Sequence, residues 1–338
     1  MGTGNSSADA VGSLAGGVRM ANIRRMSHLI RKSRRAAAVF LLSFSAAPLS
    51  GQPVGEGPLV LRLPASARLA SMANAGVAAN DGDALLYNPG MLSYARGLAA
   101  SVQRYGAFGT AGSFGTVTTV GSLAVGVGAQ FVDWLAPTGT SYGDAVRPGA
   151  TGLSDSGGVA ASSSAFTVGV ARSIKGVRVG ANVKYAEDRF GAASDGTVAV
   201  DLGASRPLGP AVLAVVVQNL GGGPRLGGTE GTLPRRVGIG YGGGPYPLWE
   251  RWDIGMQTQI TLEGDLFVRP AGGVELGYVP IDGVAILVRS GVRLPRERDE
   301  SLVTGGFGVT VDRFSLDYAL EPMRGGRPVS HRIGLRVK

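Results

Sequence analysis

The sequence contains no cysteine and only two histidines, His28 and His331. Without cysteine there is neither a disulfide framework nor a thiolate metal site. Two isolated histidines leave few ways to build a zinc site or a histidine-activated nucleophile. Aspartate and glutamate are scattered along the chain, which gives no support to hydrolysis by paired carboxylates. We therefore expect no enzyme activity, no catalytic residue, no metal and no cofactor.

Charge is also scarce. Charged residues make up 17% of the chain, against about 25% in a typical soluble domain. Residues 1–51 contribute +6 of the formal net charge of +9, because they hold seven basic residues and one acidic residue. The excess of positive charge therefore belongs mainly to the N-terminal stretch, and we expect no nucleic-acid partner.

Long hydrophobic runs are missing. The longest, "AAAVFLLSFSAAPL" at 36–49, follows the basic stretch "RRMSHLIRKSRR" at 24–35. A membrane-spanning helix needs about 20 apolar residues, so this run is too short to span and a helical membrane bundle is excluded. A basic stretch, a short apolar run and small residues at "LSGQ" are typical of a secretory signal peptide. We predict a leader over 1–51, with cleavage near Gly51.

Glycine is abundant, at 56 residues, and it takes part in a repeated alternation. In "WDIGMQTQITLE" (252–263), Trp252, Met256 and Ile260 share one parity, while Gly255 and Gln257 fall on the other. A period of two indicates a β-strand with one apolar and one polar face. Fourteen such runs follow one another: 97–106, 111–120, 122–134, 162–173, 176–189, 196–206, 210–219, 233–243, 250–263, 265–279, 283–294, 300–311, 312–321 and 329–338.

The apolar faces of these runs could look into a soluble sandwich or out into lipid, since both architectures alternate. Runs of about 10 residues suit tilted membrane strands. They follow a leader, and no second layer of helices accompanies them. Backbone groups in lipid must all be paired, so such strands have to close on themselves. We predict an all-β fold: a 14-stranded antiparallel transmembrane β-barrel over 97–338, preceded by a plug or hatch over 52–96, where the sequence does not alternate.

The connections between the runs differ in length. Short ones fall near 120 and at 174–176, 207–210, 280–282 and 311–313, and alternate with long ones at 135–161, 220–232, 295–299 and 322–328. Outer-membrane barrels have short periplasmic turns and longer external loops. We therefore expect the short turns in the periplasm. Two connections break the rule: 243–249, expected as a long periplasmic turn, and 263–265, a tight external one.

Some polar and aromatic residues are assigned by their place on the predicted strands. Asp317 and Arg332 lie on the polar parity of neighbouring runs, which predicts an ion pair in the lumen. His331 is expected at the rim. The aromatic residues near strand ends suit girdles at the membrane interfaces, although packing at strand ends would look the same: Trp134, Tyr142, Tyr246, Trp249 and Trp252.

The stretch "SARLASMANAGVAANDGDALLYNPGML" (66–92) resembles the N-terminal signature of the PorV/PorQ family, which belongs with the FadL-like outer-membrane proteins. Gly90 stands where alanine is usual in that family, and Met91 where glycine is usual. Further similar pieces occur in the same order at 198–208, 215–222, 233–242, 314–320 and 330–335. The plug residues that match the motif are Asp81, Asp83, Ala84, Tyr87, Asn88, Pro89 and Gly90.

The resemblance implies a bacterial outer-membrane barrel with lipid around it, and two classes of function. The first is association with type IX secretion, in which the barrel receives the C-terminal domains of secreted cargo from the translocon barrel. The second is FadL-like passive transport of hydrophobic small molecules. A structural membrane role is a third. A hydrophobic pocket leading to a gap in the wall would favour transport, whereas a closed wall with a broad loop platform would favour cargo.

Overall fold

The computed structural model describes residues 57–105, 109–142, 158–226, 228–296, 300–323 and 329–338. Contacts divide the chain into Met1–Leu49 and Ser50–Lys338, and all described residues belong to the second unit. The leader expected at 1–51 and the first residues of the expected plug, 52–56, lie outside the described part of the chain.

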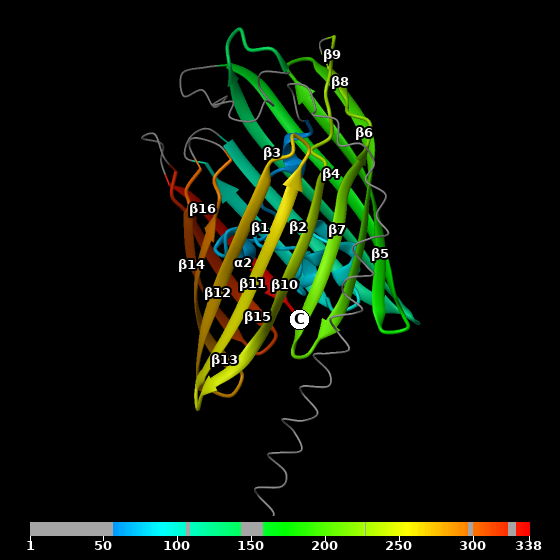
Figure 1. Ribbon diagram of the computed structural model, residues 1–338. Coiled ribbons are helices and arrows are strands. Elements are labelled where there is room, and N and C mark those ends of the chain that lie inside the picture. Colours follow the sequence, from blue (N-terminus) through cyan, green and yellow to red (C-terminus); the bar gives the residue numbers. More distant parts are fainter. Residues whose placement is uncertain (1–56, 106–108, 143–157, 227, 297–299, 324–328) are drawn as a thin grey trace, which may run out of the picture. The chain divides into compact units, whose positions relative to one another are not determined.

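Fourteen strands form one closed barrel in which every neighbouring pair is antiparallel (Figure 1). The seam is made by the first and last strands, which pair from Leu98↔Val337 to Arg104↔His331. The predicted number of strands is confirmed. Their bounds are β1 Gly97–Arg104, β2 Gly109–Val120, β3 Leu123–Pro137, β4 Gly158–Ile174, β5 Val177–Phe190, β6 Ala193–Leu208, β7 Ala211–Gly221, β10 Arg236–Trp249, β11 Trp252–Glu263, β12 Val268–Ile281, β13 Val284–Arg293, β14 Val303–Val311, β15 Phe314–Glu321 and β16 Ser330–Val337.

The apolar parity of the strands faces outward. On β11, Met256 and Ile260 are 41% and 52% exposed, whereas Gln257 between them is 2% exposed. The same holds on β5, where Val183 is exposed and Lys184 is buried. A barrel with apolar residues outside and polar residues inside is the arrangement that hydrocarbon requires. The predicted direction of the apolar face is confirmed.

The two ends of the barrel have different connections. At one end, which we call the turn end, all six connections between described strands have two residues: 121–122, 175–176, 209–210, 250–251, 282–283 and 312–313. At the other end, the loop end, the connections are longer except for 191–192 between β5 and β6, and the one after β7 carries the small hairpin β8 (Arg225–Leu226) and β9 (Thr229–Glu230). The expectation of a long turn at 243–249 was wrong. These residues continue β10, with a bulge between Gly243 and Tyr246, as far as Trp249.

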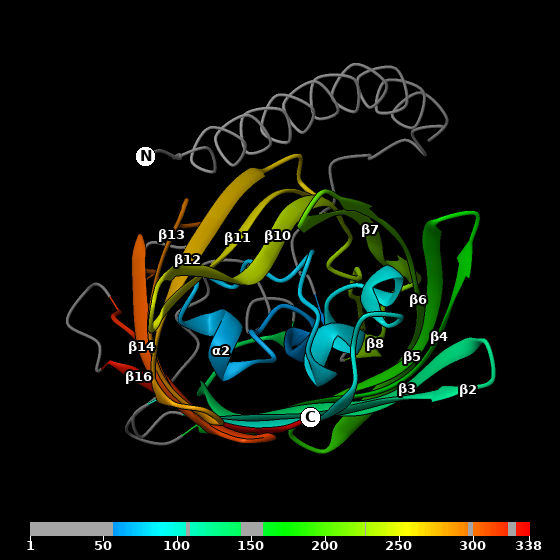
Figure 2. The same cartoon turned by 90° about the horizontal axis from the view of Figure 1, so that it is seen from below.

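Residues 57–96, which we call the plug, lie inside the barrel (Figure 2). Their elements are short: η1 Leu59–Leu61, α2 Ala67–Ala70, η2 Gly82–Leu86 and η3 Pro89–Met91. The Oγ of Ser66 accepts a hydrogen bond from the amide of Leu69 and so caps α2. Among the described residues, no helix has both the length and the apolar character needed to cross a bilayer.

Candidate functional site: the plugged lumen

The Asn-Pro-Gly motif of the plug is held by one buried amide. Asn88 Oδ1 accepts from the amide of Gly90 at 2.9 Å, which closes the turn, and Pro89 opens η3. Asn88 Nδ2 donates to the carbonyl of Val77 at 2.8 Å. Asn88 is fully buried, so its donor and acceptor groups need these partners. The residue is therefore structural: it shapes the plug and ties two of its segments together.

Gly90 presses directly on the barrel wall. A β-carbon at Gly90 would lie 2.6 Å from the amide nitrogen of Ala204 on β6. On the same strand, Ser205 Oγ donates to the Gly90 carbonyl at 2.6 Å. The wall has glycine where the motif approaches it, because a β-carbon at Gly203 would overlap Asn88 Oδ1 and one at Gly180 would overlap the carbonyl of Pro89. The plug and the wall are thus fitted backbone to backbone.

Glycine plays this part elsewhere in the lumen. β-Carbons at Gly240 and Gly334 would lie 2.7 Å from Val77 Cβ and 2.8 Å from Ala67 Cβ. Glycines on the inner face therefore make room for the plug, a role that the sequence left open between curvature and packing. Wall glycines at which a β-carbon would meet the plug closer than contact distance are Gly115, Gly126, Gly128, Gly169, Gly180, Gly203, Gly238, Gly240, Gly273, Gly291, Gly306 and Gly334.

Tyr87 fastens the plug to itself. Its hydroxyl accepts from the amide of Ala65 at 3.0 Å and donates to Asn74 Oδ1 at 2.7 Å. A β-carbon at Gly76 would overlap the Tyr87 ring. The aromatic residue of the motif therefore packs within the plug and forms no part of an open pocket.

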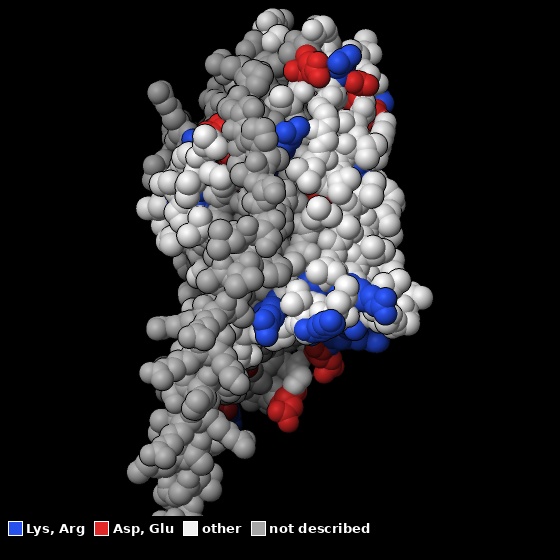
Figure 3. Space-filling view, turned by 45° about the vertical axis from the view of Figure 1, so that its right-hand side comes forward, with Lys and Arg blue, Asp and Glu red and all other residues white. Residues whose placement is uncertain are grey.

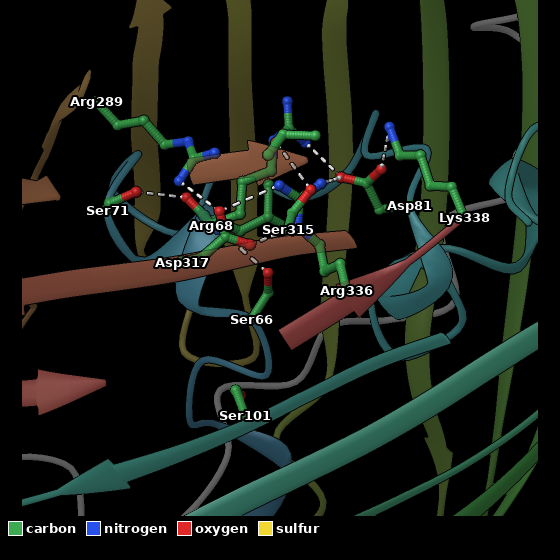
Figure 4. A network of polar contacts seen from close by, with 12 residues as sticks. Ser66, Arg68, Ser71, Asp81, Ser101, Arg289, Ser315, Asp317, Arg336 and Lys338 are labelled. Carbon is green, nitrogen blue, oxygen red and sulfur yellow. Dashed lines mark hydrogen bonds and ion pairs between the residues drawn. The ribbon is translucent and has the colours of Figure 1, made fainter. Parts of the chain in front are cut away.

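A network of buried charges joins the plug to β12, β13, β15 and β16 (Figure 4). Arg68 on α2 donates to Asp81 Oδ2 at 3.0 Å and to Glu275 Oε2 on β12 at 3.2 Å. Arg289 on β13 reaches the same Glu275 oxygen at 2.5 Å. Each carboxylate here is shared between cations, which is what buried charges need in order to be stable.

Asp81 is the point where the plug meets the last strand. Arg336 Nη1 lies 2.8 Å from Asp81 Oδ2, and Lys338 Nζ lies 3.2 Å from Asp81 Oδ1. Arg336 also holds Asp317 on β15 through Nε at 2.5 Å and Nη2 at 3.1 Å. The plug, β15 and β16 are thereby linked through a single guanidinium group.

Asp83, two residues further along the plug, is 3% exposed. Burial, and then the nearby charge of Asp81, raise the pKa of Asp83 to about 6. Its Oδ1 has no hydrogen-bond partner. Of the two aspartates in the motif, Asp81 is therefore paired with cations, whereas burial makes the charged form of Asp83 unfavourable.

The expected pair between Asp317 and Arg332 is corrected. Both side chains are buried in the lumen, as predicted, at 1% exposure each. Asp317 binds Arg336 and Arg289 Nη1, the latter at 2.8 Å. Arg332 instead donates to Gln103 Oε1 at 2.8 Å and to Ser101 Oγ at 2.7 Å, both on β1.

A second polar cluster lies on the opposite wall. Lys184 Nζ on β5 lies 2.7 Å from Asp201 Oδ2 on β6 and donates to Asn219 Oδ1 on β7 at 3.0 Å. Asn219 has a positive φ of 59° and sits at a register shift between β6 and β7. This bulge directs both Gln218 and Asn219 inward, so Asn219 does more than end a strand. Asn182 donates to the carbonyl of Leu85 at 2.8 Å and connects the wall to the plug.

Two apolar clusters fill much of the lumen beside β2–β7. The turn-end cluster joins plug residues such as Leu85, Met91 and Leu92 to wall residues such as Ala124 and Ala171. The loop-end cluster contains Val60, Leu61, Val132, Trp134, Tyr142, Ala161, Ala165, Ala186, Ala199, Leu226 and Leu233, with Leu59, Tyr105 and Phe190 beside it. Both lie along the same strands. On β3, Ala124 belongs to the turn-end cluster and Val132 to the loop-end cluster.

Leu85 is the member of the turn-end cluster that lies against a pair of wall glycines. It is fully buried. β-Carbons at Gly126 on β3 and Gly169 on β4 would lie 3.1 Å and 2.6 Å from its Cδ1. Gly126 and Gly169 are paired across the two strands. The side chain therefore fills the space beside this glycine pair, between Val117 of β2 and Asn182 of β5.

The aromatic residues divide between the inside and the outside of the barrel. Trp249 and Trp252 are 68% and 37% exposed at the turn end, in keeping with an interfacial girdle. Trp134 and Tyr142 are buried in the loop-end cluster, so for these two the alternative of packing at strand ends holds. Tyr142 donates to Asp188 Oδ2 at 2.5 Å. His331 is exposed on β16 near the loop end, where it contacts the hydroxyl of Tyr318 at 2.6 Å.

Several charged residues of the lumen were missed by sequence reasoning: Arg68, Lys184, Asp201, Glu275, Arg289 and Arg336. On the strands, the usable signal was charge on the glycine parity, as at Lys184 and Arg336. Within the described part of the chain, no cluster of three or more histidines and carboxylates could hold a metal ion.

No known family model matches the sequence, and no curated protein matches it. Solved structures do. The toluene transporter TodX from Pseudomonas putida has 13% identity and a TM-score of 0.53, over 85% of this chain and 98% of that chain. The toluene transporter TbuX from Ralstonia pickettii has 11% identity and a TM-score of 0.53, over 82% and 100% of the two chains.

This likeness shows a shared fold. It agrees with the FadL-like barrel that the sequence resemblance implied, whereas no comparison bears on the narrower PorV/PorQ resemblance.

Proposed function

We propose that the protein is an outer-membrane transporter that passes hydrophobic small molecules through its lumen. The observation that carries this proposal is the pair of apolar clusters, which follow one another along β3 and β4 from the loop end to the turn end. An apolar solute leaving one cluster would pass Leu85 and the buried polar residues Gln130 and Thr167 before it meets the second cluster. Such a path lowers the cost of moving the solute through a wet compartment.

The fold supports the same function. Both similar structures with the TM-scores given above are toluene transporters, and each is covered almost completely by this chain. Identity of 11–13% leaves the solute open. We therefore propose the class of solute, small and apolar, and not a particular compound.

In this proposal, the plug is the gate of the transporter. All neighbouring strands of the described barrel are hydrogen-bonded, so the wall has no lateral gap among them. Passage then requires the segment around η2 and η3 to shift. The contacts of that segment with β2–β6 are largely apolar, and apolar contacts have no preferred direction and re-form after a small displacement.

Secretion-associated cargo binding was the first function implied by the sequence resemblance, and the closed wall is one of the two features expected for it. Its other requirement, a broad loop platform, falls partly on residues 143–157 and 324–328, outside the described residues. Neither the similar structures nor the geometry of the lumen adds support to it, so transport is the better-supported function.

The test is uptake of a radiolabelled monoaromatic hydrocarbon by bacteria whose own transporter for hydrophobic solutes has been deleted. Cells that express the full chain should accumulate the hydrocarbon several-fold faster than cells with an empty vector. A hydrophilic sugar of similar mass is the matched control, and its uptake should not change.

Equal hydrocarbon uptake with and without the protein, at equal amounts of folded barrel, would contradict the proposal. Purification from detergent-solubilised membranes tests the alternative function, association with secretion. Co-purification of a larger barrel and secreted proteins, together with unchanged hydrocarbon uptake, would favour secretion.

A further inference from the structure

The turn end of the barrel carries an uneven distribution of charge. The strand ends and turns at 120–124, 170–181 and 202–213, in β3–β7, hold four basic residues and no acidic residue: Arg172, Lys175, Arg178 and Arg206. The corresponding parts of β10–β15, at 248–254, 278–286 and 309–316, hold four acidic residues and two arginines: Glu250, Asp253, Asp282, Asp312, Arg251 and Arg313. Figure 3 shows basic side chains gathered along the lower edge of a broad face that carries almost no charge.

Two of these cations point toward the membrane. Arg172 continues the outward row of β4 after Phe166 and Val170, and Arg206 continues the outward row of β6 after Leu202; all are exposed. Arg178 has the opposite parity, and its guanidinium lies 3.5 Å from the centre of the Tyr94 ring of the plug. Arg178 therefore belongs to the lumen, whereas Arg172 and Arg206 belong to the lipid-facing surface.

Along the barrel axis, Arg172 and Arg206 lie at the level expected for a layer of lipid headgroups. On β4, Ser162 is paired with Asp133 of β3 and Arg189 of β5, which form an outward polar row near the loop end. Arg172 follows ten residues later on the same strand. At about 3.3 Å per residue and a tilt of about 40°, that spacing is about 25 Å, the height of the apolar band of an outer-membrane barrel. Arg172 thus lies at the second edge of that band.

The cations are close enough to act together. Arg172 is paired with Val179 of β5, which is paired with Ala204 of β6, and Arg206 is the next outward residue on β6. Two strand spacings separate β4 from β6, about 10 Å. Lys175 lies in the turn between β4 and β5. Among the described residues, none of the three cations has an ion pair or a side-chain hydrogen bond to a partner.

We propose that Arg172, Lys175 and Arg206 bind the phosphate groups of anionic phospholipids in the leaflet at the turn end. The inference rests on the membrane placement in the proposed function, but not on transport. Guanidinium groups bind phosphate oxygens through paired hydrogen bonds. Val170 and Leu202, the outward neighbours of Arg172 and Arg206 toward the middle of the barrel, are each 45% exposed. They suit acyl chains below a headgroup, whereas the surface of a water-soluble partner would leave them uncovered.

The test compares lipids by native mass spectrometry on the purified full chain in detergent. Phosphatidylglycerol and phosphatidylcholine with identical acyl chains are added in equal amounts. Phosphatidylglycerol should remain bound in preference. The variant Arg172→Gln with Arg206→Gln should lose that preference, by about fivefold for each arginine. The matched control, Arg251→Gln with Arg313→Gln, removes two arginines from turns of the opposite wall and should keep it.

Each other outcome overturns the proposal. Equal binding of the two lipids, or equal loss in both double variants, would remove the site. Displacement of the lipid by inorganic phosphate at equal concentration would show a general anion site. Capture of an acidic periplasmic protein that phosphatidylglycerol does not displace would show a protein surface. Heat-modifiable migration in gels confirms folding of both variants, and unchanged hydrocarbon uptake separates this result from the proposed function.

Discussion

The two sides of the lumen hold the same plug by different forces. Beside β2–β7, the contacts are uncharged: Leu85 fills the space at Gly126 and Gly169, Gly90 lies on β6, and Asn182 and Ser205 donate hydrogen bonds to plug carbonyls. Beside β12–β16, close fit at Gly273, Gly291, Gly306 and Gly334 is joined by buried ion pairs that centre on Arg68 and Arg336. The chain thus separates a sliding surface from an anchored one.

The difference matters because the two kinds of contact respond differently to displacement. Apolar surfaces keep most of their stabilisation after a shift, since burial has no direction. A buried ion pair loses its partner as soon as it is stretched, and each uncompensated charge is costly. We therefore expect the plug to pivot about α2 and Asp81, with η2 and η3 as the moving part.

The largest effect should follow from removing the anchor. Arg336→Gln leaves Asp81 without its closest cation and Asp317 without one of its two, and we expect a loss of about 3–5 kcal/mol in stability. The apparent melting temperature of the detergent-solubilised barrel measures it. Lys338→Gln is the control, because its side chain is 62% exposed and its loss should be below about 1 kcal/mol. Equal losses would show that the network is not an anchor.

On the wall formed by β2–β7, we expect a substitution to cause a smaller loss of stability together with faster solute uptake. Leu85→Ala removes a fully buried side chain and should cost about 3 kcal/mol. Because the side chain fills the space beside Gly126 and Gly169 on the proposed path, uptake of a monoaromatic hydrocarbon should rise in the same variant. Leu69→Ala, another fully buried plug residue, should lower stability without raising uptake. Faster uptake in both variants would mean general loosening of the plug.

The smallest effect has the opposite sign and depends on pH. The pKa of Asp83 is about 6 in the folded protein and that of an unperturbed aspartate is about 3.9. Its charged form therefore destabilises the fold increasingly as pH rises from about 4 to above 6. Asp83→Asn should raise stability by about 2 kcal/mol at pH 8 and leave it unchanged below about pH 4. Melting temperatures across this range test it, and a gain independent of pH would contradict the assignment.

Most of the barrel could be predicted from the sequence, because period-two alternation reports directly on which side chains face hydrocarbon. "WDIGMQTQITLE" shows this, with Met256 and Ile260 outside and Gln257 inside. The strand count and the short turns followed from the same pattern. The exception at 243–249 failed because Gly244 and Pro245 read as a turn, whereas the strand accommodates them as a bulge.

Partners inside the lumen could not be predicted, because parity places a residue inside but does not choose its neighbour. Asp317 is paired with Gly334 in the register, so Arg332 and Arg336 flank it at equal distances along β16. The choice falls on Arg336 because Asp81 of the plug adds a second carboxylate there, while Gln103 and Ser101 of β1 occupy Arg332. Which arginine pairs with Asp317 can therefore be read only from the three-dimensional structure.

The departure of Gly90 from the alanine usual in the resembling family has a physical reason here. At 2.6 Å from the backbone of Ala204, a β-carbon has no room unless the plug moves away from β6. The sequence marked the position as unusual, and only the wall behind it explains why. Gly203 and Gly180 are explained in the same way, because a β-carbon at either position would overlap Asn88 or Pro89.

The bond between Arg336 and Asp81 joins residues 255 positions apart. During biosynthesis the aspartate emerges early and stays without this cation until the final strand has been made. That strand also completes the cylinder by joining β1. Closing the barrel and fixing the plug are consequently one event in assembly. An intermediate that lacks its last strand would have an open wall and a plug that is not yet fixed.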